Sequence, residues 1–262
     1  MIHFRRYFSG GRRLLSSALS EIQTWESYLD YCNKNNVDIT STTFKGTVYE
    51  LVVKQFLTDT LKCTDLVRIG GSFDNGIDIM GKWNLNHFWN EVRDKKMVPL
   101  TSTRVQNSMV QPLLKKSIEY SDSARRYKRR VSNNKSLLSL HDDINILVQC
   151  KNHNSKIKAA TIRELCGVYH HQVKTKRDSS RTFMFLVSPH PLTTQASRII
   201  DSSTVPIIHC KLSLPSFKGI DIQSASYGSS VILDSVFMNA MSRALVKGLK
   251  LELAFEAYKN KS

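Results

Sequence analysis

The sequence predicts an α/β fold in which a mixed β-sheet carries helices on both faces. Short apolar runs typical of buried strands alternate with longer segments whose apolar residues recur every three or four positions. The first two strands are separated by a turn-rich linker, which is typical of an antiparallel hairpin. The later strands are separated by helices, which requires parallel neighbours. The 262 residues, 41% of them apolar, suffice for one large domain.

Two amphipathic helices are expected before the first strand. Apolar residues at helical spacing predict the first helix over residues 21–35. The second is predicted from about 43 to 61, because Ser41 or Thr42 can cap its first turn and an apolar face follows. This segment contains Glu50, which lies next to the apolar face.

The remaining elements follow in the order strand, strand, strand, helix, strand, helix, strand. The predicted strands are 65–71, 77–81, 144–151, 182–188 and 205–212, and the predicted helices are 159–174 and 193–201. Together with the helix over 43–61, these segments form an αβββαβ core followed by a further helix and strand. Residues 235–258 are predicted as one long C-terminal helix.

Residues 82–143 interrupt the regular pattern and are interpreted as a long basic insertion. They contain 13 Lys and Arg against 6 Asp and Glu. A charge run of this kind is often a solvated, partly disordered loop. The alternative is a nucleic-acid-binding arm, because Tyr120 and Tyr127 are interleaved with cations that can contact phosphates. The candidate contact residues are Arg125, Arg126, Lys128, Arg129 and Arg130.

Charge and cysteine content indicate a mitochondrial protein with a polyanionic partner. The formal net charge is +16, and residues 1–20 contain four arginines, several serines and no acidic residue. This leader has the profile of a mitochondrial transit peptide. The remaining single domain, 21–262, carries +12, which favours a polyanionic partner such as nucleic acid or an anionic membrane surface. Five cysteines without a CxxC pair argue against a disulfide-stapled secreted protein. No apolar run reaches the ~18 residues of a membrane span, which argues against integral membrane association.

Three polar residues lie where strands should be apolar. Alternation along a strand places Asp78 on the face opposite to Ile77 and Ile79, and places Gln149 and Lys151 on one face. A buried Asp or Lys is costly unless it is paired or bound to a metal. If the two strands are neighbours, Asp78, Gln149 and Lys151 converge on one patch.

These residues occur in an order that resembles the PD-(D/E)XK nucleases of the restriction-endonuclease-like superfamily, in particular the Mrr-like branch. That pattern is a helical Glu, a Gly-rich stretch ending in G-x-D, and Q-x-K at a strand end. Here they are Glu50, Gly76-Ile77-Asp78 and Gln149-Cys150-Lys151. Residues 162–167, 185–188 and 193–196 resemble later motifs of the same group. The whole chain, with its leader and basic insertion, is similar to the fungal mitochondrial family named required for respiratory growth protein 7.

The resemblance implies a restriction-endonuclease-like sheet and a site for Mg²⁺ or Mn²⁺ that hydrolyses phosphodiesters. Asp78 is expected as the principal metal ligand, Glu50 as a direct or water-mediated ligand, and Gln149 as an amide ligand. Lys151 is expected to steady the phosphate or the attacking water. Taken alone, Glu50 is also explained by a surface pair with Lys54 at i,i+4.

The sequence therefore predicts a protein of the mitochondrial matrix that binds nucleic acid and cleaves it with a divalent metal. DNA is favoured over RNA only through the resemblance. The rival interpretation is a catalytically silent nuclease-fold factor that binds mitochondrial DNA or RNA. The oligomeric state is left open, a dimer included.

Overall fold

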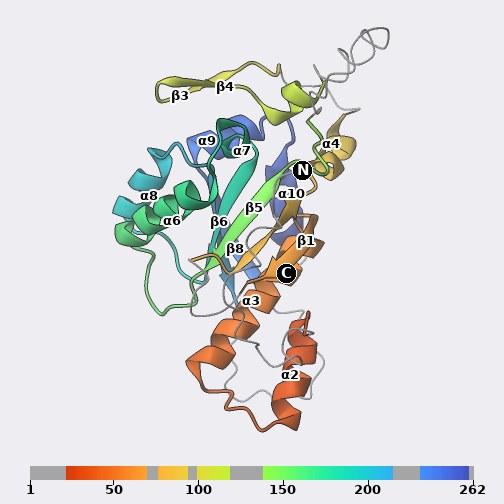
Figure 1. Cartoon of the computed structure of the whole chain (residues 1–262), viewed down its shortest axis with the longest axis vertical. Helices are drawn as coiled ribbons and strands as arrows, with labels where there is room; N and C mark the ends of the chain where they lie inside the picture. The colour runs from red at the N-terminus through yellow and green to blue at the C-terminus, as the bar shows by residue number, and fades with distance from the viewer. Residues whose placement is uncertain (1–21, 70–75, 94–98, 119–137, 215–230, 260–262) are drawn as a thin grey trace.

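A mixed six-stranded sheet forms the centre of the molecule (Figure 1). The computed structural model describes residues 22–69, 76–93, 99–118, 138–214 and 231–259. In spatial order the strands of the sheet are β1 (Cys63–Arg68), β2 (Ile79–Trp83), β5 (Asn145–Cys150), β6 (Thr182–Ser188), β7 (Ile207–Ser213) and β8 (Ile232–Met238). A separate two-stranded hairpin consists of β3 (Thr103–Val105) and β4 (Ser108–Val110).

Strand directions confirm the predicted mixed sheet. β1 and β2 form the expected antiparallel hairpin, and β2 also pairs antiparallel with β5. β5, β6 and β7 are parallel, because helices connect them in sequence. Consequently the ends of β1, β5, β6 and β7 and the start of β2 lie at one edge of the sheet.

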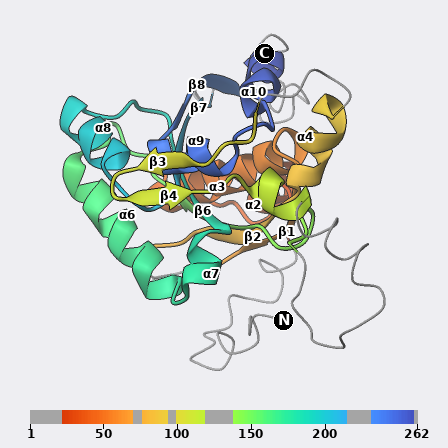
Figure 2. The ribbon, with the colours of Figure 1, turned by 90° about the horizontal axis from the view of Figure 1, so that it is seen from above.

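Helices cover both faces of the sheet, as predicted (Figure 2). The described helices are α2 (Trp25–Lys34), α3 (Thr42–Asp59), α4 (Leu85–Val92), α6 (Ala159–Gln172), α7 (Lys176–Ser179), α8 (Thr194–Asp201), α9 (Ala240–Leu245) and α10 (Leu251–Lys259). α6 and α8 pack together over one face, and α3 and α10 contribute to the core on the other. Alternation along β5 supplies both cores, since Ile146 and Val148 join the α3 cluster and Leu147 the α6 cluster.

The predicted cap of α3 is confirmed. The side chain of Ser41 accepts a hydrogen bond from the backbone N–H of Phe44 at 3.1 Å. Thr24 caps α2 in the same way through the N–H of Ser27. The Ser41 cap fixes the first turn of α3, and a middle turn of this helix carries Glu50.

The prediction of one C-terminal helix over 235–258 is wrong. Val231 and Leu233 are buried while Ile232 between them is 50% exposed, which is the alternation of the edge strand β8. α9 and α10 follow as two short helices, separated at Gly248 with φ +93°. A continuous helix would need a negative φ there, so the left-handed backbone ends it.

The predicted insertion over 82–143 is wrong at its start. β2 runs on to Trp83, whose fully buried ring meets Phe183 and Phe185 edge-on, with centroids 5.2 Å away in each case. α4 and residues 113–118, which are helical, also bury apolar side chains. The segment was interpreted from its many basic residues, but the apolar residues between them form secondary structure that packs in the core. The basic residues Arg125, Arg126, Lys128, Arg129 and Arg130 and the leader 1–20 lie outside the described residues.

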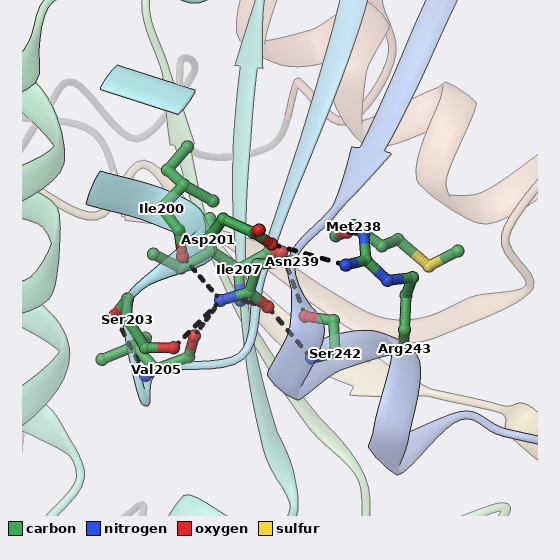
Figure 3. Close-up of polar contacts among 9 residues, drawn as sticks. All are labelled: Ile200, Asp201, Ser203, Val205, Ile207, Met238, Asn239, Ser242 and Arg243. Atoms are coloured by element: carbon green, nitrogen blue, oxygen red, sulfur yellow. Dashed lines mark hydrogen bonds and ion pairs between the residues drawn. The ribbon is translucent and has the colours of Figure 1, made fainter. Parts of the chain in front are cut away.

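A buried asparagine joins three elements at the opposite edge of the sheet (Figure 3). The side-chain oxygen of Asn239 accepts hydrogen bonds from the N–H groups of Ile207, at 3.2 Å, and Ser242, at 3.0 Å. Its amide nitrogen donates to the carbonyls of Ile200, at 3.1 Å, and Val205, at 2.8 Å. One side chain thus connects the end of α8, the start of β7 and the first turn of α9.

Two glycine substitutions test the backbone assignment and are expected to act in opposite directions. A Cβ at Gly248 would lie 2.6 Å from Leu100 Cδ2 on a left-handed backbone, so Gly248→Ala is expected to destabilise the fold by about 1–2 kcal/mol. Gly167 lies exposed in α6 with no atom within 4 Å of an added Cβ. Gly167→Ala is expected to stabilise by about 0.5–1 kcal/mol. Urea unfolding measures both, and a stabilising Gly248→Ala contradicts the interrupted helix.

Candidate active site

The candidate site lies at the sheet edge where β1 and β5 end and β2 begins. The N–H of Asp78, directly before β2, donates to the carbonyl of Val148 at 2.9 Å. The carbonyl of Asp78 accepts from the N–H of Ile69 at 2.8 Å. These bonds confirm that the strands of Asp78 and Gln149 are neighbours.

The direction of Asp78 is set by a hydrogen bond rather than by strand alternation. Ile79 packs in the α3 cluster but Ile77 in the α6 cluster, so the expectation that both isoleucines share a face is wrong. Regular pairing begins only at Ile79, after Gly76 with φ +76°. The carboxylate oxygen Oδ2 of Asp78 accepts from the N–H of Cys150 at 2.5 Å. This contact holds the carboxylate against the end of β5.

Glu50 reaches the same region from α3 and pairs with an arginine of β1. Its Oε2 lies 3.5 Å from Nη1 of Arg68, and the two side chains are 20% and 19% exposed. Lys54, the surface partner considered from the sequence, donates to Oε1 of Gln23 at 2.5 Å. The ion pair therefore connects α3 to the end of β1.

The two carboxylates act on one common neighbour. Cys150 packs on the α3 face beside Ile146 and Val148, as the strand pattern predicts. Burial raises the pKa of the Cys150 thiol, and the negative charges of Asp78 and Glu50 raise this pKa further. Residues 28 positions apart in the sequence thus place their charges around the same thiol.

Gln149 supplies a buried amide oxygen without a partner in the described part of the chain. Its side chain is in the interior, with the residue only 2% exposed. An added Cβ on Gly76 would lie 3.3 Å from Nε2 of Gln149, which places the amide beside the turn before β2. Oε1 has no hydrogen-bond partner among the described residues. A buried oxygen in this state is costly, so a water or a cation bound there would stabilise it.

Lys151 follows β5 at the same edge and is half-buried. Its N–H donates to the carbonyl of Val187 at 2.9 Å, which extends the parallel pairing with β6. The next residue, Asn152, donates through Nδ2 to the carbonyl of Lys45 near the start of α3, at 3.3 Å. The main chain that carries Lys151 is therefore fixed between β6 and α3.

The donor set suits a hard divalent cation. Two carboxylates and an amide oxygen are the oxygen ligands that Mg²⁺ prefers, and Mg²⁺ keeps several waters. Within the described ranges, no group of three or more His, Cys, Asp and Glu residues could hold a metal ion. An ion bound at this edge would therefore need further ligands besides the two carboxylates, namely the amide oxygen of Gln149, water or oxygens of the substrate. The unpartnered Oε1 of Gln149 fits that requirement.

Arg68 is the residue of this site that sequence reasoning missed. It is the last residue of β1 and lies opposite Ile79 of β2 in the register. The sequence does contain a signal for it. Arg68 directly precedes Ile69 and a Gly-Gly pair, in a strand expected to lie next to that of Asp78. In contrast, Arg163 and Glu164, which lie in the motif-like segment 162–167, are exposed on α6.

Comparisons with known proteins identify similar chains from yeasts. A family model described as "Required for respiratory growth protein 7" matches residues 41–246, a range that includes Glu50, Asp78, Gln149 and Lys151. Relatives named "Required for respiratory growth protein 7, mitochondrial" include that of Kluyveromyces lactis, 31% identical over 70% of this chain and 71% of its own length. That of Candida glabrata is 26% identical over 93% of both chains. No solved structure matches.

Proposed function

The chain belongs to the required for respiratory growth protein 7 family, and on this premise we propose that it is a metal-dependent nuclease of the restriction-endonuclease-like type. The chain is mitochondrial, and its family is named for respiratory growth. The activity in this proposal is cleavage of phosphodiesters in mitochondrial nucleic acid, with the protein acting in maintenance of that nucleic acid. The matrix is the compartment in which such a substrate is found.

The observation that carries the proposal is the hydrogen bond between the Asp78 carboxylate and the N–H of Cys150. It holds an acid at Cys150, the residue between Gln149 and Lys151 in the sequence. With α4, β3, β4 and the short α7 set aside as additions, the order α3-β1-β2-β5-α6-β6 supports the proposal, because it is the αβββαβ order of the restriction-endonuclease-like core. Glu50 extends the acidic group from α3.

The residues have separate tasks in this mechanism. Asp78 and Glu50 would hold a Mg²⁺ or Mn²⁺ ion through carboxylate oxygens, and Gln149 through its amide oxygen. Held there, such an ion would supply Lewis acidity toward a water molecule and toward the phosphate charge. Lys151 would hold a non-bridging phosphate oxygen through its ammonium group. The hydrogen bond from the backbone N–H of Cys150 orients the Asp78 carboxylate before any ligand binds.

The substrate class follows from charge. Residues 21–262 carry a net charge of +12, which attracts a polyanion and releases counterions on binding. The interaction is proposed to be with the phosphate backbone rather than with base edges. DNA is proposed ahead of RNA on the strength of the nuclease resemblance alone.

A cleavage assay with the full chain tests the proposal. Plasmid DNA, linear DNA, single-stranded DNA and RNA are each incubated with protein in Mg²⁺, in Mn²⁺ or in EDTA. We expect cleavage that needs the metal and that falls by ~10²-fold or more in Lys151→Ala, because the phosphate loses a charged partner. Lys156→Ala is the matched control, since Lys156 is exposed in the same loop. This variant is expected to cleave nucleic acid at the normal rate.

The same samples also test the rival function, that of a nucleic-acid-binding factor without catalysis. Nucleic-acid binding that weakens with salt, without cleavage of any substrate in either metal, supports a catalytically silent binding factor. That result overturns the nuclease proposal.

A further inference from the structure

The Arg68–Glu50 ion pair places a cation where the proposed site would bind another cation. Arg68 ends β1 at the site's edge of the sheet, and its guanidinium lies 3.5 Å from the Glu50 carboxylate. Both side chains are about four-fifths buried. The pair is therefore partly removed from water, where charges act on one another more strongly than at an exposed surface.

The positive charge of Arg68 also acts on Lys54, which lies near Glu50 on α3. Burial lowers the pKa of Lys54, one turn along α3 from Glu50, and the Arg68 charge lowers it further. A divalent ion at Glu50 would add two more positive charges to this neighbourhood. Metal binding and the present position of Arg68 thus oppose each other unless an anion enters.

A phosphate group supplies that anion. A guanidinium presents parallel N–H donors that match a carboxylate or a phosphate equally well. Arg68 can therefore exchange the Glu50 carboxylate for a phosphate oxygen without remaining unpaired. Glu50 is then released to a metal ion.

We propose that Arg68 couples metal binding to nucleic-acid binding, by pairing with Glu50 in the free protein and with a backbone phosphate when a divalent ion takes Glu50. This coupling rests on the proposed nuclease site and names its regulation. Before substrate arrives, Arg68 competes with the metal, so the ion binds weakly. Because binding free energies are reciprocal, the metal tightens nucleic acid by the same factor by which nucleic acid tightens the metal.

Arg68→Met tests the coupling with the full chain. Mn²⁺ binding is measured by electron paramagnetic resonance without nucleic acid. Binding of a fluorescent duplex oligonucleotide is measured by anisotropy, with and without Ca²⁺. In the unmodified protein we expect Ca²⁺ to tighten the oligonucleotide by about tenfold. In Arg68→Met we expect this factor to approach one and Mn²⁺ alone to bind several-fold more tightly, because its competitor is gone.

Arg181→Met is the matched control. Arg181 pairs with Asp143 at 3.4 Å, with side chains 13% and 30% exposed, beside the start of β6 at the opposite edge of the sheet. This variant removes a comparable ion pair and is expected to keep the full coupling factor. Arg68→Lys retains the charge without the fork and is expected to give an intermediate factor. It also provides a folded comparison if Arg68→Met is too unstable to measure.

The outcomes distinguish this inference from the function on which it rests. Unchanged coupling in Arg68→Met or Arg68→Lys, or equal loss in Arg181→Met, overturns the role of Arg68 and leaves the nuclease site intact. Absence of Mn²⁺ binding in every variant, with or without oligonucleotide, overturns the metal site and the coupling together.

Discussion

Asp78→Asn is expected to lower metal-dependent cleavage by at least ~10³-fold, because a metal ion contributes several kcal/mol to phosphodiester hydrolysis and the substitution removes its principal charged ligand. Asparagine has nearly the same shape as aspartate, and its side-chain oxygen can still accept from the N–H of Cys150. Folding should thus be retained while the charge is lost. Initial rates at saturating substrate in Mg²⁺ and Mn²⁺ measure the effect.

Asp143→Asn provides the comparison for this prediction. Asp143 pairs with Arg181 beside the start of β6, far along the sheet from the edge that carries Asp78. The variant removes one negative charge from a half-buried ion pair, and it is expected to cleave at the normal rate. If Asp78→Asn cleaves as fast as Asp143→Asn, Asp78 is not a metal ligand.

Asn239→Ala is expected to lower the free energy of unfolding by about 3 kcal/mol, because each buried backbone group left without a partner costs ~1–3 kcal/mol. The substitution removes a hydrogen-bond partner from three carbonyls, those of Ile200, Ser203 and Val205, and from two N–H groups at once (Figure 3). Asn239 is fully buried. Part of the loss is recovered where α9 or the end of α8 relaxes toward water. Equilibrium unfolding in urea measures the change.

Asn84→Ala shows what an ordinary capping asparagine contributes. The side chain of Asn84 accepts from the N–H of His87 at 3.3 Å and caps α4 at a half-buried position. Its loss is expected to cost about 1 kcal/mol. If Asn239→Ala costs no more than Asn84→Ala, the network in Figure 3 does not hold the three elements together.

Elements with a strong local signal were predictable. The cap at Ser41, the apolar face of α3 and the alternation of β5 each depend on residues within one or two turns or strand positions. The hairpin of β1 and β2 was predictable because a turn-rich linker follows an apolar run. In these segments local preference and tertiary packing favour the same structure.

The C-terminal segment shows where local pattern fails. Residues 235–258 contain apolar residues at helical spacing, and the same residues include the end of a strand and two helices. Pairing of β8 with β7 decides the strand, and the paired residues lie 19 to 30 positions apart in the sequence. Contact of Gly248 with Leu100 involves residues even further apart.

In the candidate site, too, some features were predictable from the sequence and others were not. Asp78, Gln149 and Lys151 were recognisable because polar residues interrupt apolar strands, and Glu50 because it completes a known order of motifs. Their roles as ligands stay predictions until the cleavage and binding experiments are done. The ion pair of Glu50 with Arg68 was not predicted, because helical spacing points only to Lys54 as a neighbour and Arg68 is brought to Glu50 by the folded chain.

The sequence by itself determined the core succession α3, β1, β2, β5, α6, β6, α8 and β7, the basic character of the chain, and the polar residues before β2 and at the end of β5. Only the tertiary structure decided the direction of Asp78, the pairing of Glu50 with Arg68 and the contacts of Asn239. The physical reason is that hydrophobic periodicity and capping act between near neighbours in the chain, whereas these hydrogen bonds and ion pairs form between segments that meet only when the sheet has assembled.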